Sequence, residues 1–138
     1  MTDVHNKSRR SFNMSRIRSK NTKPEMIVRK YLHGKGLRYS LHNGKLPGKP
    51  DIVLKKYKTI INVNGCFWHG HEDCKYFVVP KSRTEWWLKK INKTITRDKW
   101  IREELELLGW KVLSIWECKL KPTRRTQSLE KLYQNITD

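Results

Sequence analysis

Residues 51–64 read DIVLKKYKTIINVN, and this stretch decides the fold. Two runs rich in apolar and β-branched residues flank a short connection, KKYK, which is the pattern of a β-hairpin. A symmetric hairpin pairs Leu54 with Thr59 and therefore Asp51 with Asn62. The sequence thus predicts two antiparallel strands, with Asp51 at the start of the first.

Helical and strand patterns alternate on both sides of this hairpin. Asn21 or Thr22 can cap a helix in which Pro24 occupies the first turn and Glu25 lies at the positive end. Apolar residues at three- and four-residue steps indicate a second, longer helix that Gly109 ends. The first helix should stop at 33–36, and the long helix should span 86–108. The other expected elements are a strand at 37–42, a strand at 110–116 and a terminal helix at 126–136. Because helices alternate with strands, we expect an α/β fold.

The charge balance points to a polyanionic partner. The chain has 138 residues and carries 31 Lys and Arg against 13 Asp and Glu, a formal net charge of +18. Such a surface attracts nucleic acid at long range. The length fits one domain. We therefore expect a single domain over 1–138, with a basic arm at 1–20, a core at 21–120 and a C-terminal helix at 121–138.

The first 20 residues form the expected basic arm. Their cationic residues are Lys7, Arg9, Arg10, Arg16, Arg18 and Lys20. Few apolar residues accompany them, so this segment is expected to order mainly against phosphates, with a short helix at 12–18. We expect Arg9, Arg10, Arg16 and Arg18 to bind DNA. A solvated terminus without function is the alternative.

Several classes of protein are excluded by composition. No apolar run approaches the ~20 residues of a membrane helix, and no apolar stretch follows the N-terminal charges. Three cysteines, an odd number, argue against a disulfide scaffold and favour reduced thiols. We expect a protein of the cytosol that is neither secreted nor membrane-spanning.

A cluster of cysteines and histidines predicts a metal site. Cys66, His69, His71 and Cys74 fall within nine residues, and Cys118 is the one remaining cysteine. Zinc prefers such soft and borderline ligands in a tetrahedral arrangement. Four protein ligands leave no open position, so the site is expected to be structural. Five candidates for four places leave either His69 or His71 for other chemistry, and ordinary buried thiols are the alternative interpretation.

Asp51 is the candidate for metal-assisted chemistry. It is the one carboxylate between Glu25 and Glu72. A carboxylate that holds Mg²⁺ is the common device for neutralising a scissile phosphate. A strand-end residue with no further role is the alternative.

Tryptophan is abundant, and its positions differ in their expected environment. Trp100, Trp110 and Trp116 fall in helix and strand patterns, so we expect them in the core. Phe67 and Trp68 lie in a short loop between candidate metal ligands, which favours their exposure.

Four motifs together resemble the very short patch repair (Vsr) DNA mismatch endonuclease family. They are LPGKPD at 46–51, NGCFWH at 64–69, RTEWW at 83–87 and WEC at 116–118, and the helix start at 21–25 fits as well. The resemblance extends from about residue 5 to 120. It implies a restriction-endonuclease-like α/β core, a mixed β-sheet flanked by helices, with a structural zinc. It also implies a DNA endonuclease that nicks on the 5′ side of T in T·G mismatches left by deamination of 5-methylcytosine. Such an enzyme would be a monomeric prokaryotic protein in the cytoplasm, associated with the nucleoid.

The same resemblance implies roles for individual residues. Asp51 would bind the catalytic Mg²⁺ together with the main-chain carbonyl of Val63, and Glu25 would approach this ion through water. His69 would transfer protons at the scissile phosphate, where water attacks to leave 5′-phosphate and 3′-hydroxyl ends. His71 would then join Cys66, Cys74 and Cys118 on zinc. The wedge that enters the duplex beside the mismatch would consist of Phe67, Trp68 and Trp87.

The sequence departs from the family pattern at the second strand of the hairpin. Related enzymes carry Glu-x-Lys where this chain has Asn62-Val63-Asn64, and well-known members have histidine where this chain has Asn64. Asparagine can hydrogen-bond a phosphate but cannot shuttle a proton. The spacing from His71 to Cys74 is also one residue longer than usual. Two alternative functions remain: a zinc-stabilised DNA-binding module without catalysis, and a structure- or sequence-directed nicking or restriction nuclease on the same core.

Overall fold

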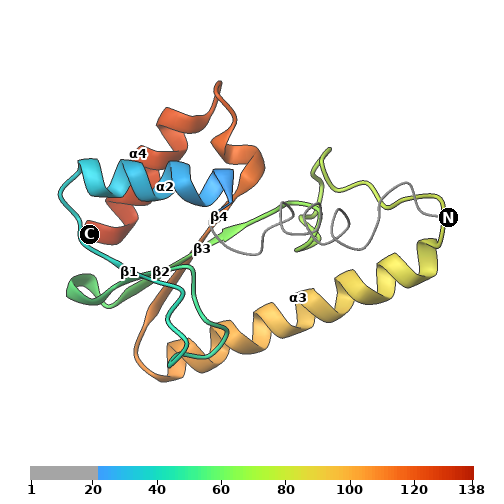
Figure 1. The fold of residues 1–138 in the computed structure, drawn as a ribbon, viewed down its shortest axis with the longest axis horizontal. Helices are drawn as coiled ribbons and strands as arrows, with labels where there is room; N and C mark the ends of the chain where they lie inside the picture. Colours follow the sequence, from blue (N-terminus) through green and yellow to red (C-terminus); the bar gives the residue numbers. More distant parts are fainter. Residues whose placement is uncertain (1–21) are drawn as a thin grey trace, which may run out of the picture.

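The structure is a computed structural model and describes residues 22–138. A mixed four-stranded sheet lies at its centre, in the order β1-β2-β3-β4 (Figure 1). The strands are β1 (Ser40–Leu41), β2 (Ile52–Leu54), β3 (Thr59–Asn64) and β4 (Lys111–Trp116). β1, β2 and β3 pair antiparallel, whereas β4 runs parallel to β3. The α/β class with a mixed sheet is therefore confirmed. The basic arm, its helix at 12–18 and its four arginines lie outside the described residues.

The predicted hairpin register is confirmed. Leu54 pairs with Thr59 and Ile52 with Ile61, so the next pair in this register is Asp51 with Asn62. The connection forms a short 3₁₀ turn, η1 (Lys55–Tyr57), and Lys58 closes it with a left-handed φ of +51°.

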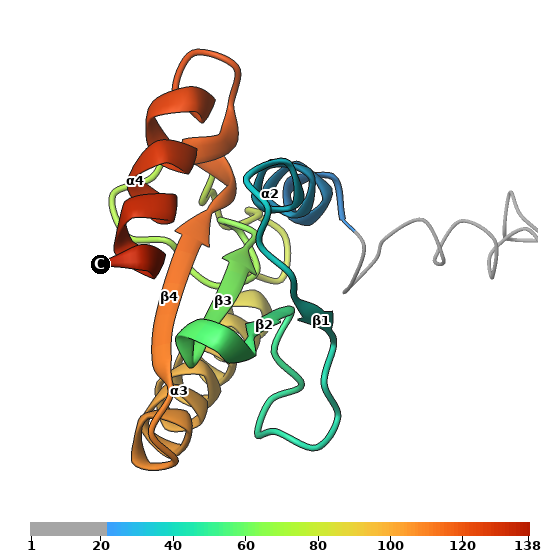
Figure 2. The same ribbon diagram turned by 90° about the vertical axis from the view of Figure 1, so that its left-hand side faces the viewer.

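Helices cover both faces of the sheet. α2 (Lys23–Gly34) and α4 (Arg125–Thr137) lie together on one face, and α3 (Thr84–Leu107) runs along the other (Figures 1 and 2). A second 3₁₀ turn, η2 (Glu117–Leu120), joins β4 to α4. Thr22 caps α2 by accepting a hydrogen bond from the Glu25 N–H at 3.3 Å, which confirms one of the two predicted caps.

Alternation along the strands separates two apolar clusters. Ile52, Leu54 and Ile61 pack with α2 and α4 in the larger cluster. Val53 and Ile60, which alternate with them, pack with the C-terminal half of α3 in the smaller one. β2 and the first half of β3 are therefore buried on both faces.

The predicted strand at 37–42 is wrong in extent. Only Ser40 and Leu41 form β1. The Leu37 N–H donates to the carbonyl of Leu32 at 3.0 Å, and Gly36 takes a φ of +83°. The end of α2 thus uses the backbone that a longer strand would need.

The prediction that Trp100 is a core residue is also wrong. Trp100 is 57% exposed, because α3 packs on the sheet only through one side of its C-terminal half, at Ile101 and Leu105. Trp110 and Trp116 are half-buried. Among residues 22–138, no helix combines the length and the apolar character that crossing a bilayer requires.

Two loops hold α3 at close range. Gly48 and Gly70 have φ values of +76° and +59°, and a Cβ on either would meet an isoleucine of α3 at less than 3.0 Å. Glycine is therefore required at both points for conformation and for space. These contacts fix the separation between α3 and the polar end of the sheet.

Candidate active site and metal centre

A groove of about 550 Å³ opens between α3 and the sheet, beyond the smaller apolar cluster. Asn62 and Asn64 continue the face of β3 that Ile60 begins, and Ser114 does the same on β4 after Val112. Polar side chains thus replace apolar ones where α3 diverges from the sheet. The groove is also lined by Asp51, His69, Asp98, Lys49, Arg97, Lys99 and Arg102. It therefore brings two carboxylates and a histidine together within cationic walls.

Asp51 lies just before β2, half-buried beside β3. Its Oδ2 accepts a hydrogen bond from the Val63 N–H at 3.1 Å. Burial raises the pKa of Asp51 above its ordinary value, and the nearby charge of Glu25 acts in the same direction. The Val63 hydrogen bond and the charges of His42 and His69 oppose this shift. A cation bound beside Asp51 would therefore stabilise the charged form of its carboxylate.

Glu25 and His42 complete a group of possible metal ligands around Asp51. One ligand atom from each of the three residues lies within 4.8 Å of the others. Glu25 is 1% exposed in the first turn of α2, and its Oε2 lies 3.0 Å from His42 Nε2 and 3.3 Å from Arg29 NH1. His42 was not among the site residues predicted from the sequence. The signal that could have found it is the pairing of β1 with β2, because this register sets His42 opposite Asp51.

His69 contacts Asp98, a residue that the sequence analysis also missed. His69 Nδ1 lies 2.6 Å from Asp98 Oδ2. Asp98 is the one carboxylate between Glu85 and Glu103 in a strongly basic helix. It also follows Ile91 and Ile95 at helical spacing, on the side that faces Gly70. An isolated acid on that side is the signal that could have revealed this pair.

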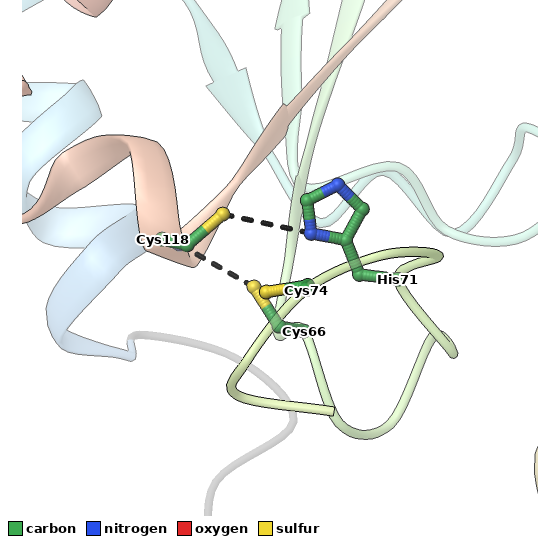
Figure 3. A group of neighbouring side chains, drawn as sticks. All are labelled: Cys66, His71, Cys74 and Cys118. Carbon is green, nitrogen blue, oxygen red and sulfur yellow. Dashed lines mark hydrogen bonds between the residues drawn. The ribbon is translucent and has the colours of Figure 1, made fainter. Parts of the chain in front are cut away.

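The structure brings Cys66, His71, Cys74 and Cys118 together and leaves His69 outside this group (Figure 3). Three of these residues follow β3 in the chain and Cys118 comes from η2, so the cluster joins the loop after β3 to the end of β4. Their ligand atoms lie within 4.8 Å of one another. Cys118 Sγ lies 3.5 Å from His71 Nδ1. In a tetrahedral zinc site, sulfur and nitrogen ligands are about 3.5 Å apart, so this donor set fits zinc.

The surroundings of the cluster affect its thiols differently. Burial raises the pKa of Cys66 to about 12, with contributions from the neighbouring thiols. Desolvation of Cys74 acts in the same direction, but hydrogen bonds from the backbone of Tyr76 and from the other thiols outweigh it and lower its pKa. His71 stacks on Trp116, with ring centroids 4.0 Å apart and an interplanar angle of 5°. The strand that lines the groove therefore also supports the metal cluster.

An aromatic cluster adjoins the groove through the chain segment that carries His69. Phe67 lies 5.1 Å from Trp68 and 5.4 Å from Trp87, measured between ring centroids. Trp68 is 44% exposed, as expected for this loop, and Lys90 lies 5.8 Å from its ring. Phe67, which was also expected to be exposed, is half-buried because it packs against Trp68 and Trp87. The structure adds Trp86, whose ring is 4.7 Å from that of Trp87. The three residues expected to form a wedge are thus neighbours.

Comparison with known proteins agrees with this geometry. Residues 2–76 match the family described as DNA mismatch endonuclease Vsr. The chain is 51% identical over 121 residues to the type II nicking enzyme V.NmeAIP of Neisseria meningitidis, covering 88% of this chain and 86% of the relative. It is 45% identical to DNA mismatch endonuclease Vsr of Escherichia coli, covering 88% and 77%. It is 42% identical to the type II nicking enzyme V.XorIIP of Xanthomonas oryzae, covering 100% and 98%. The chain therefore belongs to the Vsr family of DNA mismatch endonucleases, which are enzymes.

Proposed function

We propose that this endonuclease nicks one DNA strand on the 5′ side of T in T·G mismatches arising from deamination of 5-methylcytosine. The observation that carries the proposal is the groove in which Asp51 and the His69–Asp98 pair lie together, next to the exposed Trp68. Chemistry and mismatch recognition would then act on neighbouring nucleotides.

We assign Asp51 to a Mg²⁺ site, with the main-chain carbonyl of Val63 as a second ligand and Glu25 acting through water. The half-buried carboxylate of Asp51 and its proximity to Glu25 support this assignment. Mg²⁺ at this position would supply charge neutralisation for the phosphate and the leaving 3′ oxygen.

His69 is assigned as the group that accepts the proton of the attacking water. An ionised Asp98 carboxylate can only accept hydrogen bonds, so it retains the proton of His69 on Nδ1 and leaves the lone pair on Nε2 for the water. As the water oxygen bonds to phosphorus, the bond from phosphorus to the 3′ oxygen breaks, and the released 3′ oxygen takes up a proton from solvent water. The products are 5′-phosphate and 3′-hydroxyl ends. Asp98 thus acts as a positioning residue.

Asn64 is assigned as a hydrogen-bond partner of the scissile phosphate. It lines the groove and pairs with Trp116 in the parallel register of β3 and β4. Its amide can donate to a phosphate oxygen but offers no proton for transfer at neutral pH. Proton transfer then depends on His69.

We assign mismatch recognition to Phe67, Trp68 and Trp87. Apolar wedges kink and partly unstack a duplex at a cost of a few kcal/mol for each step, and a mismatched step is easier to open. The basic arm, with Arg9, Arg10, Arg16 and Arg18, would bind phosphates without regard to sequence.

Cys66, His71, Cys74 and Cys118 are assigned to a structural zinc. All four are protein ligands, so no position is left for substrate. Because the cluster joins the loop that carries Trp68 and His69 to η2, zinc would hold both functional segments in place.

The experiment that tests the proposal uses end-labelled duplexes with a T·G mismatch or with T·A at the same position. We expect nicking of the T·G duplex with Mg²⁺. We expect no nicking when EDTA is added shortly before the DNA to remove the Mg²⁺. A second candidate is a nicking enzyme directed by matched sequence, because the relatives from Neisseria meningitidis and Xanthomonas oryzae are described as type II nicking enzymes. Equal nicking of both duplexes would favour that candidate and contradict mismatch recognition.

A further inference from the structure

We propose that His42 is a third protein ligand at the Asp51 metal site, so that the site binds transition ions of the Co²⁺ type more tightly than Mg²⁺. The inference deepens the proposed function, because it concerns the same metal site. It assigns a role to a histidine that neither the motifs nor the mechanism uses.

The distances fit coordination of one ion. His42 Nε2 and Glu25 Oε2 are 3.0 Å apart, and one ligand atom of Asp51 lies within 4.8 Å of both. Two adjacent ligands of an octahedral ion with bonds of about 2.1 Å are separated by about 3.0 Å. The observed separation is therefore the one that a shared ion requires, as well as a hydrogen-bond distance.

The backbone holds these side chains in place. The His42 N–H donates to the carbonyl of Asp51 at 3.1 Å, which ties the two residues across β1 and β2. His42 also has a φ of +47°, an uncommon conformation for a residue other than glycine. Glu25 is buried in the first turn of α2, and its N–H donates a hydrogen bond to the side chain of Thr22, the N-cap of this helix. All three residues are thus anchored by main-chain structure.

The types of ligand atom determine which metal ion the site binds more tightly. Carboxylates and water suit Mg²⁺, whereas imidazole favours later divalent transition ions. A site of two carboxylates and one imidazole therefore gains affinity for Co²⁺ relative to a site of carboxylates alone. If His42 only hydrogen-bonds Glu25 beside Arg29, its replacement would leave the affinity for Co²⁺ relative to Mg²⁺ unchanged.

The test measures Co²⁺ and Mg²⁺ binding by calorimetry on the full chain with zinc already bound. His42→Gln keeps a hydrogen-bond donor for Glu25, and His42→Asn suits the left-handed backbone, so at least one variant should fold. His33→Gln is the matched control, because His33 is an exposed histidine on the same helix as Glu25. Zinc content and the absence of cobalt–thiolate absorption verify that the cysteine cluster is unchanged.

We expect both His42 variants to bind Co²⁺ at least about tenfold more weakly, with Mg²⁺ affinity changed less than about threefold. His33→Gln should match the unmodified protein for both ions. Unchanged Co²⁺ affinity in the His42 variants, or equal losses for Co²⁺ and Mg²⁺, would overturn the proposal.

The outcome is separable from that of the proposed function. Nicking of the T·G duplex by the unmodified protein with Mg²⁺ tests the function alone. If the His42-dependent preference for Co²⁺ is found without T·G nicking, the proposed function fails and this inference stands. If T·G nicking is found without that preference, the proposed function stands and this inference fails.

Discussion

At the scale of single residues, the site combines a carboxylate that burial disfavours in its charged form with a histidine whose orientation is fixed. Asp51 has a raised pKa, and its Oδ2 receives the Val63 N–H. His69 is held by Asp98 from a helix that lies across the groove. Each of these residues suggests a substitution that preserves shape while changing its chemistry.

Asp51→Asn should reduce nicking by about 10³-fold while leaving DNA binding intact, because the amide cannot neutralise a metal ion. The variant should also be more stable than the unmodified protein at neutral pH without Mg²⁺. Because the folded-state pKa of Asp51 is raised, its contribution to stability is present at low pH and is lost as pH rises through that pKa. Thermal unfolding at several pH values and single-turnover nicking measure both effects. Nicking at a comparable rate would remove Asp51 from the mechanism.

Asp98→Asn should reduce nicking by about 10²- to 10⁴-fold with little change in thermal stability or DNA binding. The amide no longer selects the tautomer of His69 that leaves Nε2 free. Glu103→Gln, an exposed residue on the same helix, is the control and should nick normally. The pH dependence of the rate should also differ between Asp98→Asn and the unmodified enzyme. If both variants behave alike, Asp98 has no positioning role.

At the scale of elements, loop length and alternation predicted the hairpin correctly, including the pairing of Leu54 with Thr59. The same reasoning did not limit β1 to Ser40 and Leu41, because the end of α2 takes the Leu37 N–H. It also assigned Trp100 to the core, although only one side of α3 near its C-terminus meets the sheet. Local patterns therefore specified the strands better than the way a long helix packs on them.

The candidate site was predictable to the extent that its residues lie in motifs. Asp51, His69 and the cysteines stand in short, distinctive strings. His42 contacts Glu25 across 17 positions of the chain, and Asp98 contacts His69 across 29. Those contacts depend on how α2 and α3 pack on the sheet, which single-sequence periodicity does not specify.

The cluster of Cys66, His71, Cys74 and Cys118 links the loop after β3 to η2, and replacements of His71 and of the neighbouring His69 should differ in their effect. Cys118→Ser should lose zinc and unfold or aggregate, because binding of a structural zinc contributes directly to folding. His69→Ala should stay folded and retain zinc but lose nicking. Metal analysis and thermal unfolding of both variants, together with His71→Ala, check this contrast. Zinc lost from His69→Ala but retained by His71→Ala would reverse the assignment.

At the scale of the whole molecule, we assign general attraction to DNA and mismatch recognition to different parts of the chain. Lysine and arginine residues occur along the whole sequence, whereas the aromatic cluster occupies one loop and the start of α3. Contacts with phosphates depend on salt and are insensitive to sequence. Stacking of aromatic residues depends on how easily a base pair opens.

Trp68→Ala should weaken binding mainly to the mismatched duplex, by roughly 1–3 kcal/mol for each stacked base. Replacing Arg9 and Arg10 with Ala should instead weaken binding to matched and mismatched duplexes alike and flatten the salt dependence. Binding measured for both duplexes across a salt series distinguishes the two effects. Equal losses for Trp68→Ala, or lower thermal stability without a change in discrimination, would contradict a role of Trp68 in mismatch recognition.

The most direct test of the central claim is a cleavage map at nucleotide resolution of one T·G duplex, labelled in turn on the T strand and the G strand. We predict a single Mg²⁺-dependent cut on the 5′ side of T, with a 5′-phosphate and a 3′-hydroxyl, and an intact G strand. Cuts in both strands, or an equal cut in the duplex with T·A at that position, would contradict the account.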